Sequence, residues 1–371
     1  MDRFSVGHSG GADWHAAVEA CAARLDPAPV GANLGFVYAT DHFADDFGKI
    51  VATLVERTGI KDWVGTTGVG ICATGREYFG EPAVAAMAGR FPEGSFALFD
   101  TVEDDPADFV ASRRAWLARS ESHFGVVHGD PRHPRTAALI PGLADATDCF
   151  LVGGLSSSRG AYPQVAGTLC EAALSGVMFD GDVPVATALT QGCAPIGPVR
   201  EITACRDNVV FEIAGRPALD VFKEDVGEAL AGDLARVAGE IYAAFPVRGS
   251  DHADYTVRNL VAIDTENGFI AIAEPLDEGR QIMFCRRDRE TARADLDRML
   301  ADLTRRAGGE AKGAVYFSCL ARGPQMFGGD SAELERIRGA IGDVPLVGFF
   351  CNGEISHDRL YAYTGVLSLF L

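Results

Sequence analysis

The chain has 371 residues, 47% hydrophobic and 23% charged, a composition typical of a globular protein with two domains or one large core. Its 52 acidic residues against 33 basic residues give a net charge of −19. This excess repels nucleic-acid phosphates and acidic lipid surfaces, which argues against both classes of partner. No export signal and no apolar run of about 20 residues is present, so we expect a cytoplasmic protein without membrane insertion.

The first 155 residues alternate helix and strand patterns. Apolar residues at helical spacing predict helices over 12–25, 42–57, 106–119 and 135–143. Runs of strand-forming residues predict strands over 34–39, 95–99, 124–130 and 149–154, with a glycine-rich strand–turn–strand over 63–75. The first 30 residues are open to two interpretations, an ordered cap or a frayed arm.

From 164 to 213 short strand-like runs follow each other with turns between them. The patterns after this stretch predict helices over 217–230 and 233–244, a hairpin over 254–276, a strand over 280–287, a helix over 289–306, a strand over 314–317, a helix over 331–341, and closing strands from 346 and from 360. Units of βα type mixed with hairpins predict an α/β fold, or α+β as the alternative, in which helices flank mixed sheets.

The chain carries an internal similarity. The segment 127–160 and the segment 316–356 each contain a strand with a polar end, a helix, and a second strand that ends in Val-Gly and small residues. The stretch "WVGTTGVG" offers a third ending of this type. We expect two pseudo-symmetric halves, a 1–248 domain and a 249–371 domain, with a linker near 246–254. The alternative is that the similarity is the general pattern of βαβ units.

Seven stretches together resemble the FIST sensory domain, in both its N-terminal and C-terminal parts. They are "LGFVYATD", "WVGTTGVGICATGREYFGEPAV", "LVGGLSSS", "QGCAPIGP", "RGPQMFGG", "PLVGFFCNGEI" and "YTGVLSLF". The resemblance implies a bacterial small-ligand sensor, with amino acids as suggested ligands. One branch of the family resembles haem-binding nitric-oxide sensors that act on histidine kinases. No kinase, cyclase or F-box segment fits in the remaining residues, so a signal would have to pass through a partner protein, such as a histidine kinase.

One strand ending offers a candidate ligand site. The strand 314–317 runs into Cys319, and Arg322 and Gly323 follow. A guanidinium presents a planar fork to a carboxylate, and glycine lets a ligand approach the backbone closely. Ligands of open sheets bind beyond the carboxyl ends of the strands, which is where these residues fall.

The corresponding ending "FFCNGEI" adds Asn352, Gly353 and Glu354. A guanidinium for a carboxylate and an acid for an ammonium would suit a zwitterion, so Arg322, Asn352 and Glu354 are predicted to face one hollow. The structural alternative is that Arg322 and Glu354 pair with each other and fix two loops.

Two further residues join the candidate site. Cys193 lies in the rigid segment "QGCAPIGP", which could form a pocket wall or turn a corner between sheets. Arg287, in "CRRD", is a second guanidinium for an anion, with a solvated side chain as the alternative.

His128 is the best-placed candidate axial ligand should a haem bind, because it ends a strand beside Gly129; the alternative is a hydrogen-bonded loop histidine. A thiol-dependent enzyme using Cys319 with His128 is the second alternative to a sensor. Nine scattered cysteines without CxxC spacing argue against a structural zinc site, and no complete catalytic signature is present, so no catalytic residue is assigned.

Overall fold

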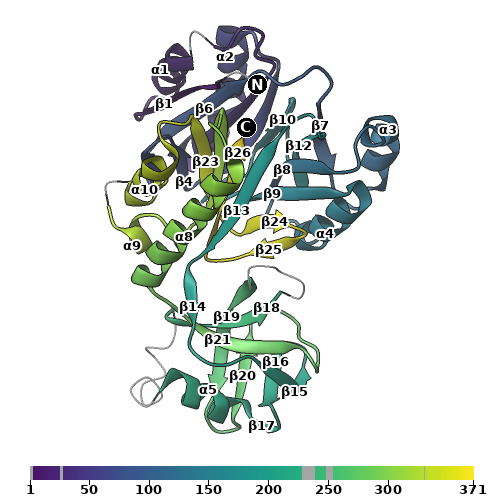
Figure 1. Ribbon diagram of the computed structural model, residues 1–371, viewed down its shortest axis with the longest axis vertical. Coiled ribbons are helices and arrows are strands. Elements are labelled where there is room, and N and C mark those ends of the chain that lie inside the picture. Colours follow the sequence, from purple (N-terminus) through teal and green to yellow (C-terminus); the bar gives the residue numbers. More distant parts are fainter. Residues whose placement is uncertain (1–2, 26–27, 228–238, 248–253, 330) are drawn as a thin grey trace. The chain divides into compact units, whose positions relative to one another are not determined.

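The computed structural model describes residues 3–25, 28–227, 239–247, 254–329 and 331–371 (Figure 1). The chain forms two compact units. Unit 1 consists of residues 1–190 and 296–371, and unit 2 of residues 191–295. The domain boundary expected at 248/249 lies outside the described residues, and the compact units follow a different division, in which unit 2 is inserted into unit 1.

Unit 1 repeats one run of six strands three times. The first copy contains β1 (Ser5–Gly10), β2 (Leu34–Thr40), β3 (Asp62–Gly68), β4 (Gly70–Ala73), β5 (Arg76–Phe79) and β6 (Ala83–Gly89). The second contains β7 (Phe96–Val102), β8 (His123–Gly129), β9 (Cys149–Leu155), β10 (Gln164–Ala166), β11 (Thr168–Cys170) and β12 (Leu174–Phe179). The third contains β13 (Val185–Gln191), β22 (Gly313–Cys319), β23 (Leu346–Cys351), β24 (Glu354–His357), β25 (Arg359–Tyr361) and β26 (Thr364–Phe370).

The three copies exchange their hairpins. The sheet orders are β1-β6-β2-β3-β10-β11, β7-β12-β8-β9-β24-β25 and β13-β26-β22-β23-β4-β5. Each sheet therefore holds four strands of one copy and a hairpin of another. The parallel pairs β2–β3, β8–β9 and β22–β23 occupy the same position in each sheet. The exchange ties the three sheets into one unit, because no copy completes its sheet alone.

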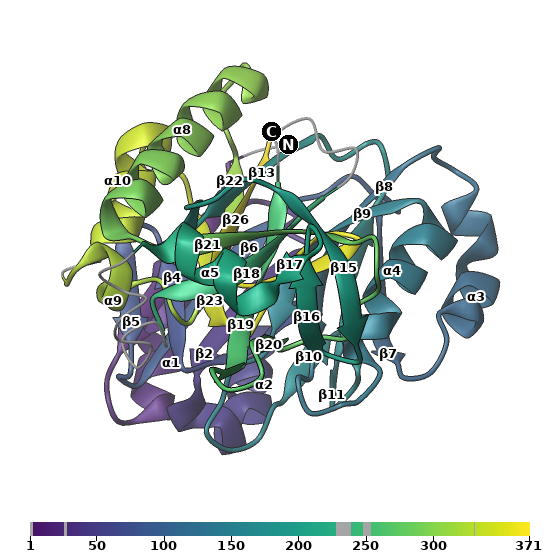
Figure 2. The ribbon, with the colours of Figure 1, turned by 90° about the horizontal axis from the view of Figure 1, so that it is seen from below.

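The helices repeat with the same period. The described helices of unit 1 are α1 (Trp14–Leu25), the 3₁₀ helix η1 (Asp41–Asp46), α2 (Phe47–Thr58), α3 (Ala107–Leu117), α4 (Thr136–Thr147), α8 (Arg289–Ala307), α9 (Pro324–Phe327) and α10 (Ala332–Ile341). The first residues of α8, up to Asp295, are assigned to unit 2. Figure 2 shows α1 with α2, α3 with α4, and α8 with α10 as three groups on the periphery. Each sheet thus has helices on its outer face, and the inner faces share one core.

A glycine marks the same point in each copy. A Cβ atom at any of the three would lie 1.7 to 1.9 Å from the carbonyl oxygen opposite it on the parallel neighbour. The glycines and their register partners are Gly65 with Val37, Gly153 with Val127, and Gly348 with Tyr316. The Val-Gly similarity in the sequence therefore reflects a close approach of two strands, which only glycine permits.

The residues that directly follow Val37, Val127 and Tyr316 in the sequence meet in the core. They are Tyr38, His128 and Phe317, all fully buried. Their ring centroids lie 5.6 to 6.3 Å apart, and Phe349 stacks on Tyr38 at 5.3 Å. The core of unit 1 therefore has a pseudo-threefold arrangement at this level.

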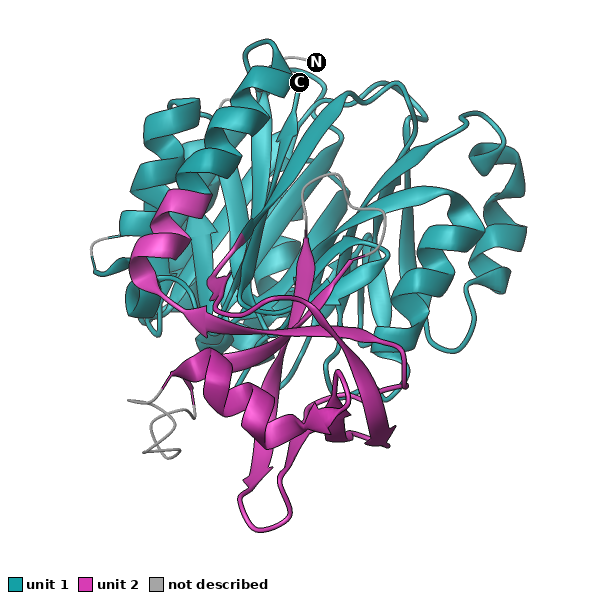
Figure 3. Cartoon of the chain, turned by 60° about the horizontal axis from the view of Figure 1, so that its bottom comes forward, with its two compact units in different colours: residues 1–190, 296–371 teal, residues 191–295 magenta. Residues whose placement is uncertain are grey.

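Unit 2 is a closed antiparallel barrel (Figure 3). The ring runs β21-β15-β16-β20-β19-β18 and closes by pairing β18 with β21. Its elements are β14 (Cys193–Pro195), β15 (Arg200–Arg206), β16 (Val209–Ile213), β17 (Arg216–Pro217), α5 (Ala218–Val226), β18 (Ile241–Pro246), β19 (Tyr255–Asp264), β20 (Phe269–Ile272) and β21 (Gln281–Arg287). Phe222 of α5 packs edge-on against Phe284 of β21 at 4.9 Å, which fixes the helix to the barrel core.

The α/β class with mixed sheets flanked by helices is confirmed. Of the two interpretations of the N-terminal segment, the ordered one agrees with the structure, because residues 5–10 form β1 and the helix predicted over 12–25 is α1. Strand β6, "AVAAMAG", was not predicted, because alanine has low strand propensity, yet the strand is fully buried. The helix predicted over 233–244 falls partly outside the described residues, and its end is wrong, because Ile241–Pro246 forms β18.

Candidate ligand-binding site

Arg322 follows the carboxyl end of β22, and its side chain is completely buried. Its Nε donates to Oε1 of Glu333 at 2.9 Å, and Nη2 forms an ion pair with the same oxygen at 2.7 Å. The ring of Phe327 lies 4.9 Å from the guanidinium carbon. Within the described residues neither Nη1 nor Nη2 forms a hydrogen bond, so Nη2 is held by the ion pair alone and Nη1 has neither kind of partner. The guanidinium is therefore fixed on one edge and open on another.

Glu333, in the first turn of α10, is the anchor for this arginine. Besides Arg322, its carboxylate accepts hydrogen bonds from the Tyr316 hydroxyl at 2.6 Å, the Ser318 hydroxyl at 3.2 Å and the Gly323 amide at 3.2 Å. Gly323 adopts φ 57°, and a Cβ there would lie 2.7 Å from the Phe350 ring. Glycine is needed at this position for the conformation and for the space.

Glu77, at the start of β5, caps α10 from another copy of the repeat. Its Oε1 accepts hydrogen bonds from the amides of Glu333 at 3.1 Å and Leu334 at 3.3 Å. Burial, together with the negative charge of Glu333, raises the pKa of Glu77 to about 7. Its Oε2 has no hydrogen-bond partner in the described part of the chain.

Glu354, the first residue of β24, completes the group. Its Oε2 accepts hydrogen bonds from the amide of Thr364 at 3.1 Å and from its hydroxyl at 2.8 Å. Burial raises the pKa of Glu354 to about 8, although Thr364 and the charge of Arg322 act in the opposite direction. Oε1 of Glu354 also has no hydrogen-bond partner among the described residues.

We call Glu77, Arg322, Glu333 and Glu354 the Arg322 cluster. All four side chains are at most 5% exposed, and Arg322 interacts electrostatically with each of the three carboxyl groups. Buried polar atoms in native proteins are almost always paired, so three unpaired ones around a single guanidinium are unusual. Such atoms are suited to the polar groups of a small ligand.

Four of the predicted residues meet at this cluster. Arg322, Gly323 and Glu354 belong to it or touch it, and the thiol of Cys319 interacts electrostatically with Glu354. The predicted structural alternative named Glu354 as the partner of Arg322, whereas the ion pair is made with Glu333.

The next two predicted residues lie on the connection between β23 and β24. The backbone amide of Asn352 donates to Leu155 and the carbonyl of Gly353 accepts from the same residue, which ties this turn to β9. Asn352 is exposed, so its side chain is separated from the buried cluster. Cys193 and Arg287 belong to unit 2, where they are register partners on β14 and β21.

His128 lies in an environment that does not fit a haem. It is fully buried, its Nε2 lies 3.1 Å from the Tyr38 hydroxyl, and the rings of Phe317 and Phe349 pack on it at about 6 Å (6.3 and 5.8 Å). Burial lowers the pKa of His128 to about 3. The space that a porphyrin would need beside this imidazole is filled by aromatic rings.

The chemistry of a nucleophilic thiol is likewise unsupported at Cys319. Burial and the neighbouring Glu354 raise the pKa of this thiol well above its usual value, and the thiolate is the reactive form. His128 pairs with Tyr38. Among the described residues no cluster of three or more His, Cys, Asp or Glu is arranged to hold a metal ion.

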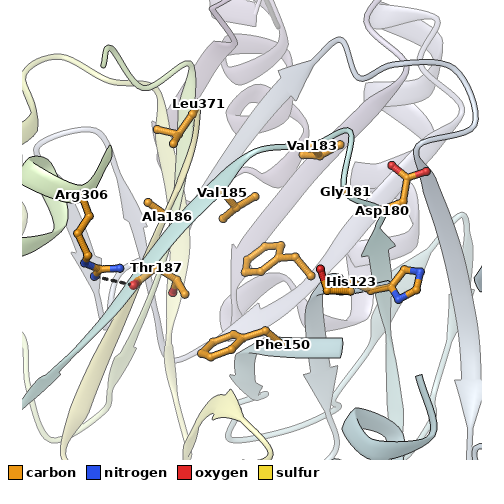
Figure 4. A pocket seen from close by; sticks show the side chains of 12 residues that line it. His123, Phe150, Asp180, Gly181, Val183, Val185, Ala186, Thr187, Arg306 and Leu371 are labelled. Carbon is orange, nitrogen blue, oxygen red and sulfur yellow. Dashed lines mark hydrogen bonds between the residues drawn. The ribbon is translucent and has the colours of Figure 1, made fainter. Parts of the chain in front are cut away.

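A surface pocket of about 450 Å³ lies at the amino ends of β8 and β9 (Figure 4). Phe150 and Val185 are among its apolar lining residues. Its charged groups are engaged: Arg306 donates to the Thr187 carbonyl at 2.9 Å, and Asp180 pairs with Arg119 at 3.4 Å. The pocket offers mainly apolar surface, so it is a weaker site for a charged metabolite than the Arg322 cluster.

Two members of the cluster, Glu77 and Glu333, were missed by the sequence analysis. Glu333 follows Ser331 at the start of a helix. An acidic residue there is already explained by its favourable interaction with the helix dipole, so the sequence gives no reason to expect an ion pair with Arg322. Glu77 lies in a short strand, 256 residues from the helix it caps. Its one sequence signal is an acid beside two aromatic residues in the short stretch "REYF".

The sequence matches the FIST N domain over residues 33–216 and the FIST C domain over residues 218–357. It is 28% identical over 325 residues to Uncharacterized protein Rv0628c of Mycobacterium tuberculosis, covering 83% of each chain. It is 27% identical over 381 residues to Uncharacterized protein Mb0898c of Mycobacterium bovis, covering 96% of this chain and 95% of that protein. With both domain types matched in order over most of its length, this chain belongs to the FIST family.

Proposed function

We propose that this protein is a small-ligand sensor of signal transduction whose ligand binds at the Arg322 cluster. FIST domains are associated with the sensing of small ligands. The observation that carries the choice of site is the fully buried guanidinium of Arg322 with an unpaired nitrogen, beside carboxyl groups that each keep one unpaired oxygen. An amino acid, which has a carboxylate for Arg322 and an ammonium for Glu354, would satisfy these atoms.

The cluster is placed where a ligand could alter the fold around it. It joins β22 and α10 of the third copy, the exchanged hairpin strand β5 of the first copy, and β24, which pairs with β9 of the second copy. A ligand shifts a conformational equilibrium only through unequal affinity for the two states. We propose that ligand binding favours one arrangement of these copies, and that a cytoplasmic partner such as a histidine kinase detects the change. Within the described residues no helix is long and apolar enough to cross a membrane.

The test is a thermal-shift screen of amino acids, amines and small carboxylates on the full chain. A ligand at 100 times its Kd stabilises the folded state by about 2.7 kcal/mol, which is easily measured as a rise in Tm. Glu354→Gln should abolish the shift while the variant stays folded by circular dichroism. Arg159→Ala, which removes an exposed guanidinium from Asp41 at another strand end, is the matched control and should keep the shift. An unchanged shift in Glu354→Gln would contradict this site.

A haem sensor is the alternative from the same family, and no observation favours it here. We expect the protein purified from haem-supplemented cells to be colourless. A Soret band that disappears in His128→Ala but persists in His133→Ala would reverse this conclusion.

A further inference from the structure

The Arg322 cluster contains more acids than bases. If all three carboxyl groups were ionised, they would outnumber the single guanidinium and leave a net charge of −2 in a buried volume. Burying an ion without a partner costs several kcal/mol, so this state is strongly disfavoured. Glu333 holds the guanidinium. Glu77 and Glu354 are therefore left to be neutralised by protons or by an external cation.

The surrounding elements supply no second cation. The titratable groups that interact with Glu354 and Glu77 come from β22, β23, β4 and α10, and they are Cys319, Cys351, Cys72, Glu333 and Arg322. Thiols and carboxyl groups cannot compensate negative charge. Among the described residues Arg322 is the one cation in this set.

The hydrogen bonds leave one oxygen of each carboxyl group available. Thr364 occupies Oε2 of Glu354, and the amino end of α10 occupies Oε1 of Glu77. The other oxygens are the unpaired ones. An ammonium group carries three hydrogen-bond donors and a positive charge. It can therefore donate a hydrogen bond to the unpaired oxygen and also balance the negative charge of the carboxylate. At Glu354 a hydroxyl would supply hydrogen bonds alone, and a carboxylate would add to the negative charge; the carboxylate of an amino acid would instead lie at Arg322.

We propose that the ligand carries a primary ammonium group that binds Glu354 in exchange for the proton held by this carboxyl group, so that ligand binding releases a proton. The proposal rests on the proposed function, since it concerns the same site. In the exchange the protonated Glu354 loses its proton to the buffer, and the resulting carboxylate pairs with the ammonium. No covalent bond changes.

The experiment is calorimetric titration of the full chain with L-alanine and ethylammonium, against propionate as the matched compound without an amine. Heats measured in phosphate and in Tris at one pH give the number of protons released. We expect release to approach one proton per ligand at pH 7, and affinity to rise about tenfold per pH unit between pH 6 and 8. Thr364→Val, which removes a donor to Glu354, should move this rise to higher pH.

The ligand-free protein gives an independent reading. Infrared absorption of a protonated carboxylic acid should persist at pH 7 and be reduced in Glu354→Gln. Equal absorption in the two proteins would overturn the exchange, whatever compound binds. Binding of propionate alone, or of alanine without proton release, would also overturn it but leave the sensor proposal in place. Failure of the whole thermal-shift panel to stabilise the protein would count against both proposals.

Discussion

Two arginine–carboxylate pairs stand at strand ends of unit 1 in different environments. Arg322 and Glu333 are both completely buried. Arg159 follows β9 and pairs with Asp41 after β2 at 2.6 Å; its side chain is 59% exposed and that of Asp41 is 2% exposed. We call this the exposed pair, because its guanidinium is in contact with solvent. In the exposed pair Arg159 also donates from its backbone amide and its Nε to the same carboxylate. The geometry of the ion pair is similar, whereas the surroundings differ.

The two pairs differ in whether all their polar atoms have partners. The exposed pair is complete, because Asp41 and Arg159 satisfy each other and water reaches the rest of the guanidinium. The buried pair is embedded among two further carboxyl groups, and this cluster holds buried atoms without a hydrogen-bond partner among the described residues. Stability alone does not explain such a cluster, because well-packed apolar residues in its place are often as stabilising. We propose that a ligand completes it.

The two pairs should differ most in the free energy of unfolding that is lost when each arginine is replaced by alanine. Arg322→Ala leaves Glu333 buried without its cation, so we expect a loss of about 3–5 kcal/mol in the free energy of unfolding. Arg159→Ala removes the guanidinium from the nearly buried Asp41 carboxylate but keeps the hydrogen bond from the backbone amide, so we expect a smaller loss of about 1–2 kcal/mol. Urea denaturation of the two variants beside the parent chain measures both values. Similar losses in the two variants would remove the distinction between the pairs.

The two pairs should also differ in the direction in which the free energy of unfolding changes with pH. Glu77 and Glu354 have folded-state pKa values raised above 4.5, so their contribution is fully present below that pH and is lost as pH rises through about 7 and 8. The loss is on the order of a few kcal/mol. Burial alone would raise the pKa of Asp41, but its hydrogen bonds with Arg159 leave it lowered, so this carboxylate loses its contribution as pH falls.

Unfolding measured from about pH 2 to pH 9 tests these signs. Glu354→Gln should flatten the alkaline loss, because glutamine does not titrate, and Asp41→Asn should flatten part of the acid loss. His128 adds to the acid limb of the parent chain: its pKa of about 3 means that the unfolded state takes up a proton first as pH falls below 6.5. An alkaline limb unchanged by Glu354→Gln would show that this carboxyl group is ionised in the folded protein.

Many of the helices and strands could be predicted from the sequence, because the spacing of apolar residues indicates which side of a local segment is buried. The Val-Gly strand endings and the helices between them follow from patterns a few residues long, and two of the three copies were visible in this way. The hairpin exchange was not predictable, since pairing of β4 with β23 joins residues more than 270 positions apart. Sequence patterns say that a hairpin exists and leave open which sheet it completes.

The site was predictable only in part for a related reason. Arg322, Gly323 and Glu354 were found because glycine and charge at a strand end are unusual. The partner of Arg322 was misassigned, because the choice between Glu333 and Glu354 depends on how closely α10 and β24 approach. The burial of Arg322 was also unexpected, as arginine is seldom fully buried unless it is paired.

A smaller effect concerns the backbone that supports the buried pair. Gly323→Ala places a Cβ against the Phe350 ring at a positive φ, and we expect a loss of about 1–3 kcal/mol. Gly160→Ala is the control on the exposed side, where a Cβ meets nothing within 4 Å and φ is not positive. Thermal unfolding of the two variants should separate them, and equal Tm values would show that the turn at Gly323 adapts.

The smallest effect is the response of the two pairs to salt. Screening acts on exposed charges over about 8 Å at physiological ionic strength and acts much less on buried ones. Raising sodium chloride to about 1 M should therefore reduce the difference between the parent chain and Arg159→Ala, whose guanidinium is exposed, while Arg322→Ala stays destabilised. Urea midpoints at low and high salt measure this change for each variant. If salt also rescued Arg322→Ala, water and ions would have access to Glu333, and a ligand could enter the cluster without any part of the fold opening.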